Sequence, residues 1–110
     1  APATNQLERV LTDRLMQQDS GLMNDMLQLF LQLAPERLEK LEMAAARSDA
    51  VTLTQEARMI RAAAGQLASR SLGECAASIE RSAARRDFDH VKRDLETLRL
   101  EIRSIEALTI

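Results

Sequence analysis

The stretch FDHVKRDLETLRLEIRSIEAL, residues 88–108, carries the clearest periodic pattern of the chain. Its apolar residues recur at steps of three and four, at Phe88, Val91, Leu95, Leu98, Ile102 and Ile105. This spacing places them in one stripe along an α-helix, whereas a strand would alternate apolar and polar residues. A long helix with one apolar stripe is stable in water mainly when that stripe packs against other helices. The stretch therefore predicts one helix of an all-α bundle.

The same periodicity predicts four more helices upstream, over Leu7–Met16, Gly21–Arg47, Ala50–Leu67 and Ser71–Arg85. The apolar faces are Leu7, Val10, Leu11 and Leu15 in the first; Leu22, Met26, Leu29, Phe30, Leu33, Leu38, Leu41 and Ala45 in the second; Leu53, Ala57, Ile60, Ala64 and Leu67 in the third; and Leu72, Cys75, Ala76, Ile79 and Ala83 in the fourth. Because Pro35 removes one backbone hydrogen bond, we expect a kink in the second helix, or two separate helices. Asp49 can cap the helix that follows it.

The connections between these helices are short, so consecutive helices should be antiparallel. We expect an all-α, antiparallel up-down four-helix bundle over residues 7–110, with a short additional N-terminal helix and a linker over residues 1–6. The composition agrees, because 110 residues suit one domain, and 3 Gly, 2 Pro and 2% aromatic residues are unlike a β-sandwich or barrel.

Several classes of function are excluded by composition. A single Cys forms no intramolecular disulfide, and one Cys with one His is too few for a His/Cys zinc site. No apolar run approaches the roughly 18 residues that a membrane-spanning helix needs. The residues also include no glycine-rich phosphate loop and no Ser–His–Asp pattern. We therefore expect a cytoplasmic domain with no metal, no cofactor, no membrane insertion and no catalytic residues of its own.

The net charge of −2 hides an uneven distribution. Residues 57–86 hold six arginines against two glutamates, whereas the segments before and after are acidic. On the side of the third helix away from its apolar face lie Thr54, Arg58, Arg61, Ala62 and Gly65, with Gln66 beside them. Small residues allow a close approach and arginines bind carboxylates, which favours an acidic protein partner over nucleic acid. Close packing or docking would explain Gly65, although a plain solvated surface remains the alternative.

Two sequence motifs, in the predicted second and third helices, match those of a known family. In LQLFLQLAP, residues 27–35, the order Leu-x-x-Phe-x-x-x-x-Pro is present, and Asp49 opens the third helix. ARMIRAAAGQLA, residues 57–68, follows the register of Ala-His-x-Leu-Lys-Gly-x-Ala-x-x-Leu-Gly. In these stretches the chain resembles the histidine phosphotransfer (HPt) domains of two-component phosphorelays, over about residues 7–106. The resemblance implies the four-helix fold and a docking surface for a response-regulator receiver domain.

The resemblance also implies a changed chemistry, because Arg58 stands at the family's phosphoryl-accepting His. Arg61 stands at its Lys, Ala62 at the Gly that leaves room for the phosphoryl group, and Ala68 at the later Gly. A guanidinium stays protonated and offers no nucleophilic nitrogen near neutral pH. We therefore expect a degenerate HPt domain that binds a receiver or another signalling protein through Thr54, Arg58, Arg61, Ala62, Gly65 and Gln66 without accepting phosphate.

Two alternatives remain from sequence. The bundle could be a structural or oligomerisation module, including a homodimer, of a hybrid sensor histidine kinase, whose cytoplasmic part it would then form. Active phosphotransfer through another residue is the second, and His90 is the only histidine. The neighbouring Asp94, which we expect on the outer face of its helix with Glu101, would repel a phosphoryl group there.

Overall fold

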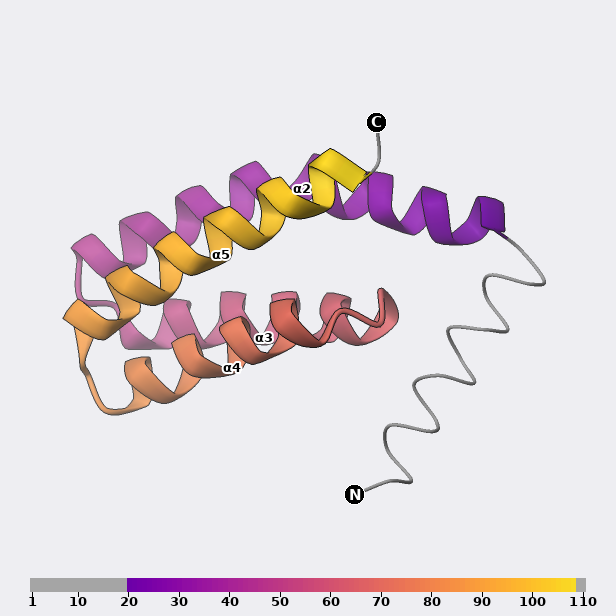
Figure 1. Cartoon of the computed structure of the whole chain (residues 1–110). Coiled ribbons are helices and arrows are strands. Elements are labelled where there is room, and N and C mark those ends of the chain that lie inside the picture. The colour runs from indigo at the N-terminus through magenta and orange to yellow at the C-terminus, as the bar shows by residue number, and fades with distance from the viewer. Residues whose placement is uncertain (1–19, 109–110) are drawn as a thin grey trace, which may run out of the picture.

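The computed structural model describes residues 20–108, and within that range it contains four α-helices and no strand. They are α2 (Ser20–Ala46), α3 (Ala50–Gln66), α4 (Arg70–Ala84) and α5 (Phe88–Leu108), shown in Figure 1. The bounds agree with the sequence prediction to within one residue, and α5 matches it at both ends. The predicted helix over residues 7–16 lies outside the described residues.

The four helices form two layers, with α2 and α5 in one and α3 and α4 in the other (Figure 1). Each helix packs against two neighbours, in the order α2, α3, α4, α5 and back to α2, and the backbones of the diagonal pairs do not approach each other closely. The three short connections reverse the chain direction each time, so neighbours are antiparallel. The predicted antiparallel four-helix bundle is thus confirmed for the described residues.

The three connections share one backbone geometry. Their middle residues are in the left-handed region although none is glycine: Ser48 at φ 56°, Ala68 at 54° and Arg86 at 58°. In the first connection Ser48 N–H donates to Ala45 O at 3.2 Å and Asp49 N–H donates to Ala44 O at 2.8 Å. The other two connections repeat this pair of bonds. The helices α2, α3 and α4 therefore each end in a Schellman motif, which satisfies their last carbonyl groups and turns the chain within three residues.

The residue after each left-handed residue caps the next helix. Asp49 accepts hydrogen bonds from the Thr52 amide at 3.1 Å and from the Thr52 hydroxyl at 2.6 Å, which confirms the predicted cap. These bonds stabilise the charged carboxylate and lower the pKa of Asp49. Ser69 caps α4 in the same way, and the Asp87 side chain accepts an amide hydrogen of the first turn of α5.

The core lies between the two layers. The predicted inward residues of α3, α4 and α5 are buried, except that Leu67, Phe88 and Ile105 are only partly buried at the helix ends. The fully buried large side chains are Leu41, Leu53, Ile60, Leu72, Ile79, Val91 and Leu98. This one cluster joins all four helices: the apolar stripes of α3, α4 and α5 pack against the buried residues of α2, which are Phe30, Ala34, Leu41, Ala44 and Ala45.

The first half of α2 differs from the prediction. Leu22, Leu29 and Leu33, which belong to its periodic apolar face, are 44%, 57% and 39% exposed. The reason is length, because α2 has 27 residues and its partner α3 has 17, so the first turns of α2 extend past the end of α3. Pro35 lies inside a continuous α2, so the alternative of two separate helices is wrong.

No helix in the described range, residues 20–108, is long and apolar enough to cross a bilayer.

Candidate functional site

The six residues predicted to form a docking face all lie on α3, on its solvent side. Arg58, Arg61, Ala62, Gly65 and Gln66 are exposed, and Thr54 is half-buried. The opposite side of α3 is buried through Leu53, Ala57, Ile60 and Ala64. The Thr54 hydroxyl donates to Ala50 O at 2.8 Å, so it serves its own helix. The helical period of the buried side therefore sets which residues face the solvent.

Both arginines of this face bind one carboxylate from the next helix. Arg58 Nε lies 3.2 Å from Glu80 Oε1, to which it donates a hydrogen bond, and Arg61 Nε lies 3.1 Å from Glu80 Oε2. The side chains of Arg58 and Arg61 are 66% and 54% exposed, whereas the side chain of Glu80 is only 14% exposed. We call Arg58, Arg61 and Glu80 the arginine clasp. It links α3 to α4 on the outside of the bundle.

Within the arginine clasp, several N–H donors of the two arginines and one carboxylate oxygen of Glu80 make no hydrogen bond with the described part of the chain. A guanidinium has five N–H donors, and each arginine directs only its Nε toward Glu80. Glu80 Oε2 is buried and accepts no hydrogen bond, although it lies at ion-pair distance from Arg61. The remaining donors of both arginines are in a position to bind the carboxylate of a second molecule.

The sequence did not identify Glu80 as part of the site, because the ion pairs run between two helices. The available signal was composition: Glu74 and Glu80 are the two acids within residues 57–86. Which of them meets the arginines depends on how α3 and α4 are rotated against each other. That rotation cannot be read from the period of either helix alone.

Gly65 does not have the packing role that we considered for it. A Cβ atom added at Gly65 would meet no heavy atom within 4 Å, so nothing in the described part of this chain requires glycine there. By contrast, a Cβ at Gly73 on α4 would lie 3.6 Å from the Ala64 side chain, an ordinary contact. The expectation of close packing within the bundle is therefore wrong, and docking remains a reason for this residue.

Two hollows flank the exposed side of α3. On the α2 side, an open apolar groove of about 300 Å³ is lined by Met26, Leu29, Phe30, Leu33, Arg37, Met59, Ala62, Ala63, Gln66 and Leu67. On the α4 side, a second open hollow of about 280 Å³ is lined by Arg61, Ala64, Gly65, Ala68, Ser69, Arg70, Gly73, Glu74 and Ala77. The predicted docking face is thus a ridge: Ala62 and Gln66 border the apolar groove, and Arg61 and Gly65 border the small-residue hollow.

A second polar cluster lies between α4 and α5. Asp94 Oδ2 accepts hydrogen bonds from the Ser78 hydroxyl at 2.9 Å and from the Ser82 hydroxyl at 3.2 Å. His90 Nε2 lies 3.3 Å from Asp94 Oδ1. The prediction that Asp94 is an outer-face charge is therefore wrong, since its side chain is 14% exposed and Ser82 is fully buried. We call Asp94, Ser78, Ser82 and His90 the aspartate cluster.

The arrangement around His90 does not favour phosphate transfer. A carboxylate oxygen 3.3 Å from its Nε2 would repel the negative oxygens of a phosphoryl group. The serine hydroxyls that the carboxylate also binds belong to α4 and point into the helix interface. The cluster therefore satisfies polar groups between two helices, which is a packing role.

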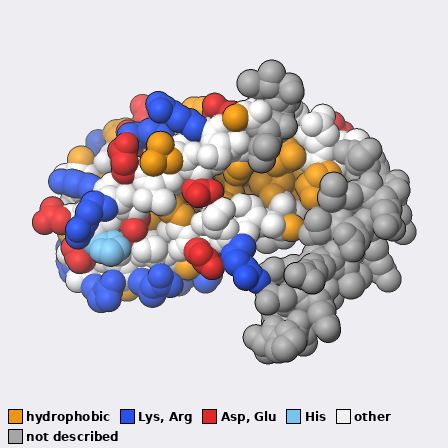
Figure 2. Space-filling model, in the orientation of Figure 1, with side chains coloured by type: hydrophobic (Ala, Val, Ile, Leu, Met, Phe, Trp, Pro, Cys, Tyr) orange, Lys and Arg blue, Asp and Glu red, His pale blue; other side chains and the backbone are white. Residues whose placement is uncertain are grey.

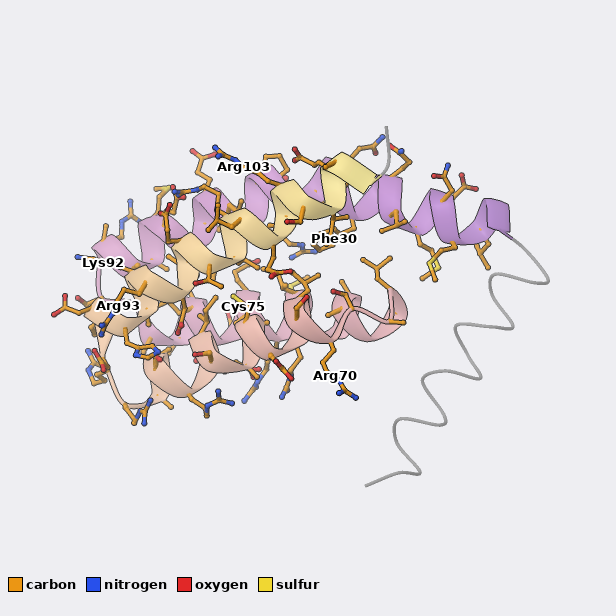
Figure 3. All side chains as sticks on the ribbon, viewed as in Figure 1. Phe30, Arg70, Cys75, Lys92, Arg93 and Arg103 are labelled. Carbon is orange, nitrogen blue, oxygen red and sulfur yellow. The ribbon has the colours of Figure 1, made fainter. Side chains whose placement is uncertain are left out.

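Cys75 is buried between the two layers, as expected for a small apolar side chain (Figure 3). Its thiol donates to the backbone oxygen of Asp94 at 3.3 Å. Burial, with the nearby charges of Asp94 and Glu101, raises the pKa of Cys75 to about 11. A thiol that stays protonated at neutral pH is a poor nucleophile and a poor metal ligand.

Over residues 20–108 no group of three or more His, Cys, Asp and Glu side chains is placed to hold a metal ion. No protein-family model matches the chain, and neither a curated protein nor a solved structure matches it.

Proposed function

We propose that this domain binds a response-regulator receiver domain, or another signalling protein with an acidic surface, through the α3 face around Arg58. In this proposal it acts in a two-component phosphorelay as an HPt-like docking module that does not accept phosphate. The support from sequence is the register of residues 57–68. The support from geometry is the arginine clasp, which exposes two fixed positive charges beside small side chains.

The observation that carries the proposal is the exposure of Arg58 and Arg61 on either side of one carboxylate. Receiver domains of the family's partners present an acidic pocket around their phosphorylatable Asp. Charge-assisted bonds between guanidinium groups and carboxylates are among the stronger polar contacts between proteins. Ala62 and Gly65 carry little side chain beside them, so a partner surface can approach the α3 backbone.

Glu80 sets the strength of this site. Its negative charge already attracts both arginines, so an incoming carboxylate competes with it. Because the arginines are more than half exposed, the internal pairs are weak, about 1 kcal/mol or less each. The clasp therefore holds the two cations in place on α3 while leaving them open to exchange for a partner's acid.

The absence of phosphate transfer follows from the chemistry of the same position. An accepting residue needs a free electron pair, which the protonated guanidinium of Arg58 does not offer. In an assay with a receiver domain carrying radiolabelled aspartyl phosphate, we expect the receiver to bind and no label to appear on this chain. Acid-labile label that disappears in His90→Ala would instead establish transfer through His90.

The docking proposal is tested by calorimetric titration of the full chain with a panel of receiver domains. Arg58→Glu should abolish binding or weaken it at least tenfold, because it turns an attraction into a repulsion. Arg103→Glu is the matched control, since Arg103 projects from α5 on the side away from the α3–α4 layer (Figure 3). The proposal fails if no receiver binds, or if the two variants bind alike.

A second candidate function is an oligomerisation bundle within a cytoplasmic part of a hybrid sensor histidine kinase. The observation that favours it is the apolar groove, where Leu29, Leu33 and Met59 are 57%, 39% and 48% exposed. Light scattering over a range of concentrations distinguishes the two. A stable dimer that is lost in Leu29→Glu supports oligomerisation, and a monomer at all concentrations rules it out.

A further inference from the structure

The outer side of α4 carries a positive charge that the predicted docking face on α3 does not include. Arg81 is exposed, and it follows the fully buried Ile79 by two residues, which is about 200° around a helix. Its side chain therefore points away from the core. Arg70 projects outward from the start of α4 in Figure 3. Because Arg70 and Arg81 are separated by about three full turns, they share the outer side of the helix.

Arg81 differs from the two clasp arginines in its partners. Within residues 20–108 its side chain makes no ion pair and no hydrogen bond, whereas Arg58 and Arg61 both pair with Glu80. Glu80 directly precedes Arg81 in α4, but it lies on the side of α4 that faces α3, since it contacts both clasp arginines. A carboxylate from a partner competes with Glu80 at the clasp and meets no such competitor from the described helices at Arg81.

The outer side of the α3–α4 layer is positively charged. Figure 2 shows Lys and Arg side chains along the lower edge of the molecule, which this layer forms in Figure 1. The two acids within residues 57–86 do not cancel this charge at Arg81. Glu80 is 14% exposed and already bound by the clasp, and Glu74 lies about two turns, roughly 10 Å, from Arg81 along α4. Salt screens exposed charges over about that distance.

The size of an ordinary interface brings α4 within reach of a partner that binds α3. A stable complex buries about 800 Å² on each protein, which is a patch roughly 28 Å across. Neighbouring helices pack only about 8–10 Å apart, so a partner centred on α3 also covers an adjacent helix. On the α4 side the small-residue hollow lies beside Arg61 and reaches Ala77, one turn before Arg81. No large side chain lines it between these points, so a partner surface can lie across both helices.

We propose that the docking face continues from α3 across the small-residue hollow onto α4, where Arg81 is a third arginine that binds an acid of the partner. This inference rests on the proposed function, since it requires an acidic partner at the α3 face. It also describes that partner more closely. The partner presents at least two acidic groups about one helix spacing, roughly 10 Å, apart, one for the arginine clasp and one for Arg81.

Calorimetric titration of the full chain with a receiver domain tests the role of Arg81. Arg81→Gln removes the charge and keeps a good helix former, and we expect it to weaken binding about two- to fivefold, the change that corresponds to one exposed ion pair. Arg81→Glu reverses the charge and should weaken binding further. Arg103→Glu makes the same change in net charge on α5, away from the α3–α4 layer, and should leave the affinity unchanged (Figure 3). Circular dichroism of each variant checks that α4 is retained.

The outcomes separate this inference from the proposed function. If Arg58→Glu abolishes binding while Arg81→Glu binds like Arg103→Glu, the docking face ends at α3, and only the inference is overturned. If no receiver binds the wild-type chain, both are overturned. Amide signals of the nitrogen-15-labelled chain give a test without substitutions: adding the receiver should shift the signals of Ala77 and Arg81 together with that of Arg58. Shifts that leave α4 unchanged would contradict the inference.

Discussion

The arginine clasp and the aspartate cluster each contain one carboxylate at the edge of the bundle. The side chains of Glu80 and Asp94 are equally buried, with 14% exposed in each. Asp94 is held by two serine hydroxyls within the α4–α5 interface, and Glu80 is held by two arginines on the outside of α3.

The difference between them lies in the partners. Ser82 is fully buried, and the Ser78 and Ser82 hydroxyls both donate to Asp94, so neither serine has a hydrogen left to offer another molecule. The arginines are more than half exposed, so the clasp keeps spare donors that face the solvent. Equal burial of a carboxylate therefore accompanies a packing role in one place and the binding role that we propose in the other.

The largest expected effect is on the aspartate cluster. Asp94→Ala leaves the buried Ser82 hydroxyl without its acceptor, and such a loss costs about 2–3 kcal/mol of the free energy of unfolding. Asp94→Asn keeps one carbonyl acceptor and should cost less. Urea denaturation of the three proteins measures both values. Equal stability of Asp94→Ala and the wild type would remove the packing role.

The next effect tests the connection that holds α3 on α4, the two helices of the clasp. Ala68 sits at φ 54°, which strains a residue with a Cβ atom, and Ala68→Gly should raise the free energy of unfolding by about 1 kcal/mol. Ala84→Gly, inside the last turn of α4, is the control and should destabilise instead. A loss of stability in Ala68→Gly would contradict the assigned backbone geometry.

A smaller effect is expected for the clasp itself. Glu80→Gln removes the charge that both arginines attract, but exposed ion pairs contribute about 0.2–1 kcal/mol. Thermal unfolding should therefore show a much smaller shift than for Asp94→Ala. A shift as large as that of Asp94→Ala would mean that the arginine clasp stabilises the packing of the helices, as the aspartate cluster does. The distinction between the two sites would then be wrong.

A third carboxylate, on the surface, gives the smallest effect and a pH dependence. The hydrogen bonds from Thr52 lower the pKa of Asp49 in the folded state, so its contribution is present above the unfolded pKa and is lost as pH falls through the folded one. Asp49→Asn keeps a capping oxygen that does not titrate. The stability difference between Asp49→Asn and the wild type should narrow in acid, and a constant difference would contradict this.

The sequence predicted those features that depend on one segment at a time. The stripe from Phe88 to Ile105 and the corner at Arg85–Asp87 determine α5 locally, and its bounds agree. The exposure of Leu29 and Leu33 was not predictable, because periodicity does not tell how far one helix outreaches its neighbour. The partners of Glu80 and Asp94 depend on the rotation of α4 against α3 and α5. The apolar periodicity of one helix does not determine how that helix is rotated against its neighbours.

The central claim is that Arg58 and Arg61 bind a partner's acid in competition with Glu80. Titration of a receiver domain with Glu80→Gln and with Glu96→Gln tests it, because Glu96 also pairs with an arginine, Arg99, but lies on α5, away from α3. Glu80→Gln should tighten the binding of the receiver about two- to fivefold, the change in affinity that corresponds to the loss of one exposed ion pair. Glu96→Gln should leave the affinity unchanged. Equal affinity of the two variants, or weaker binding by Glu80→Gln, would contradict the claim.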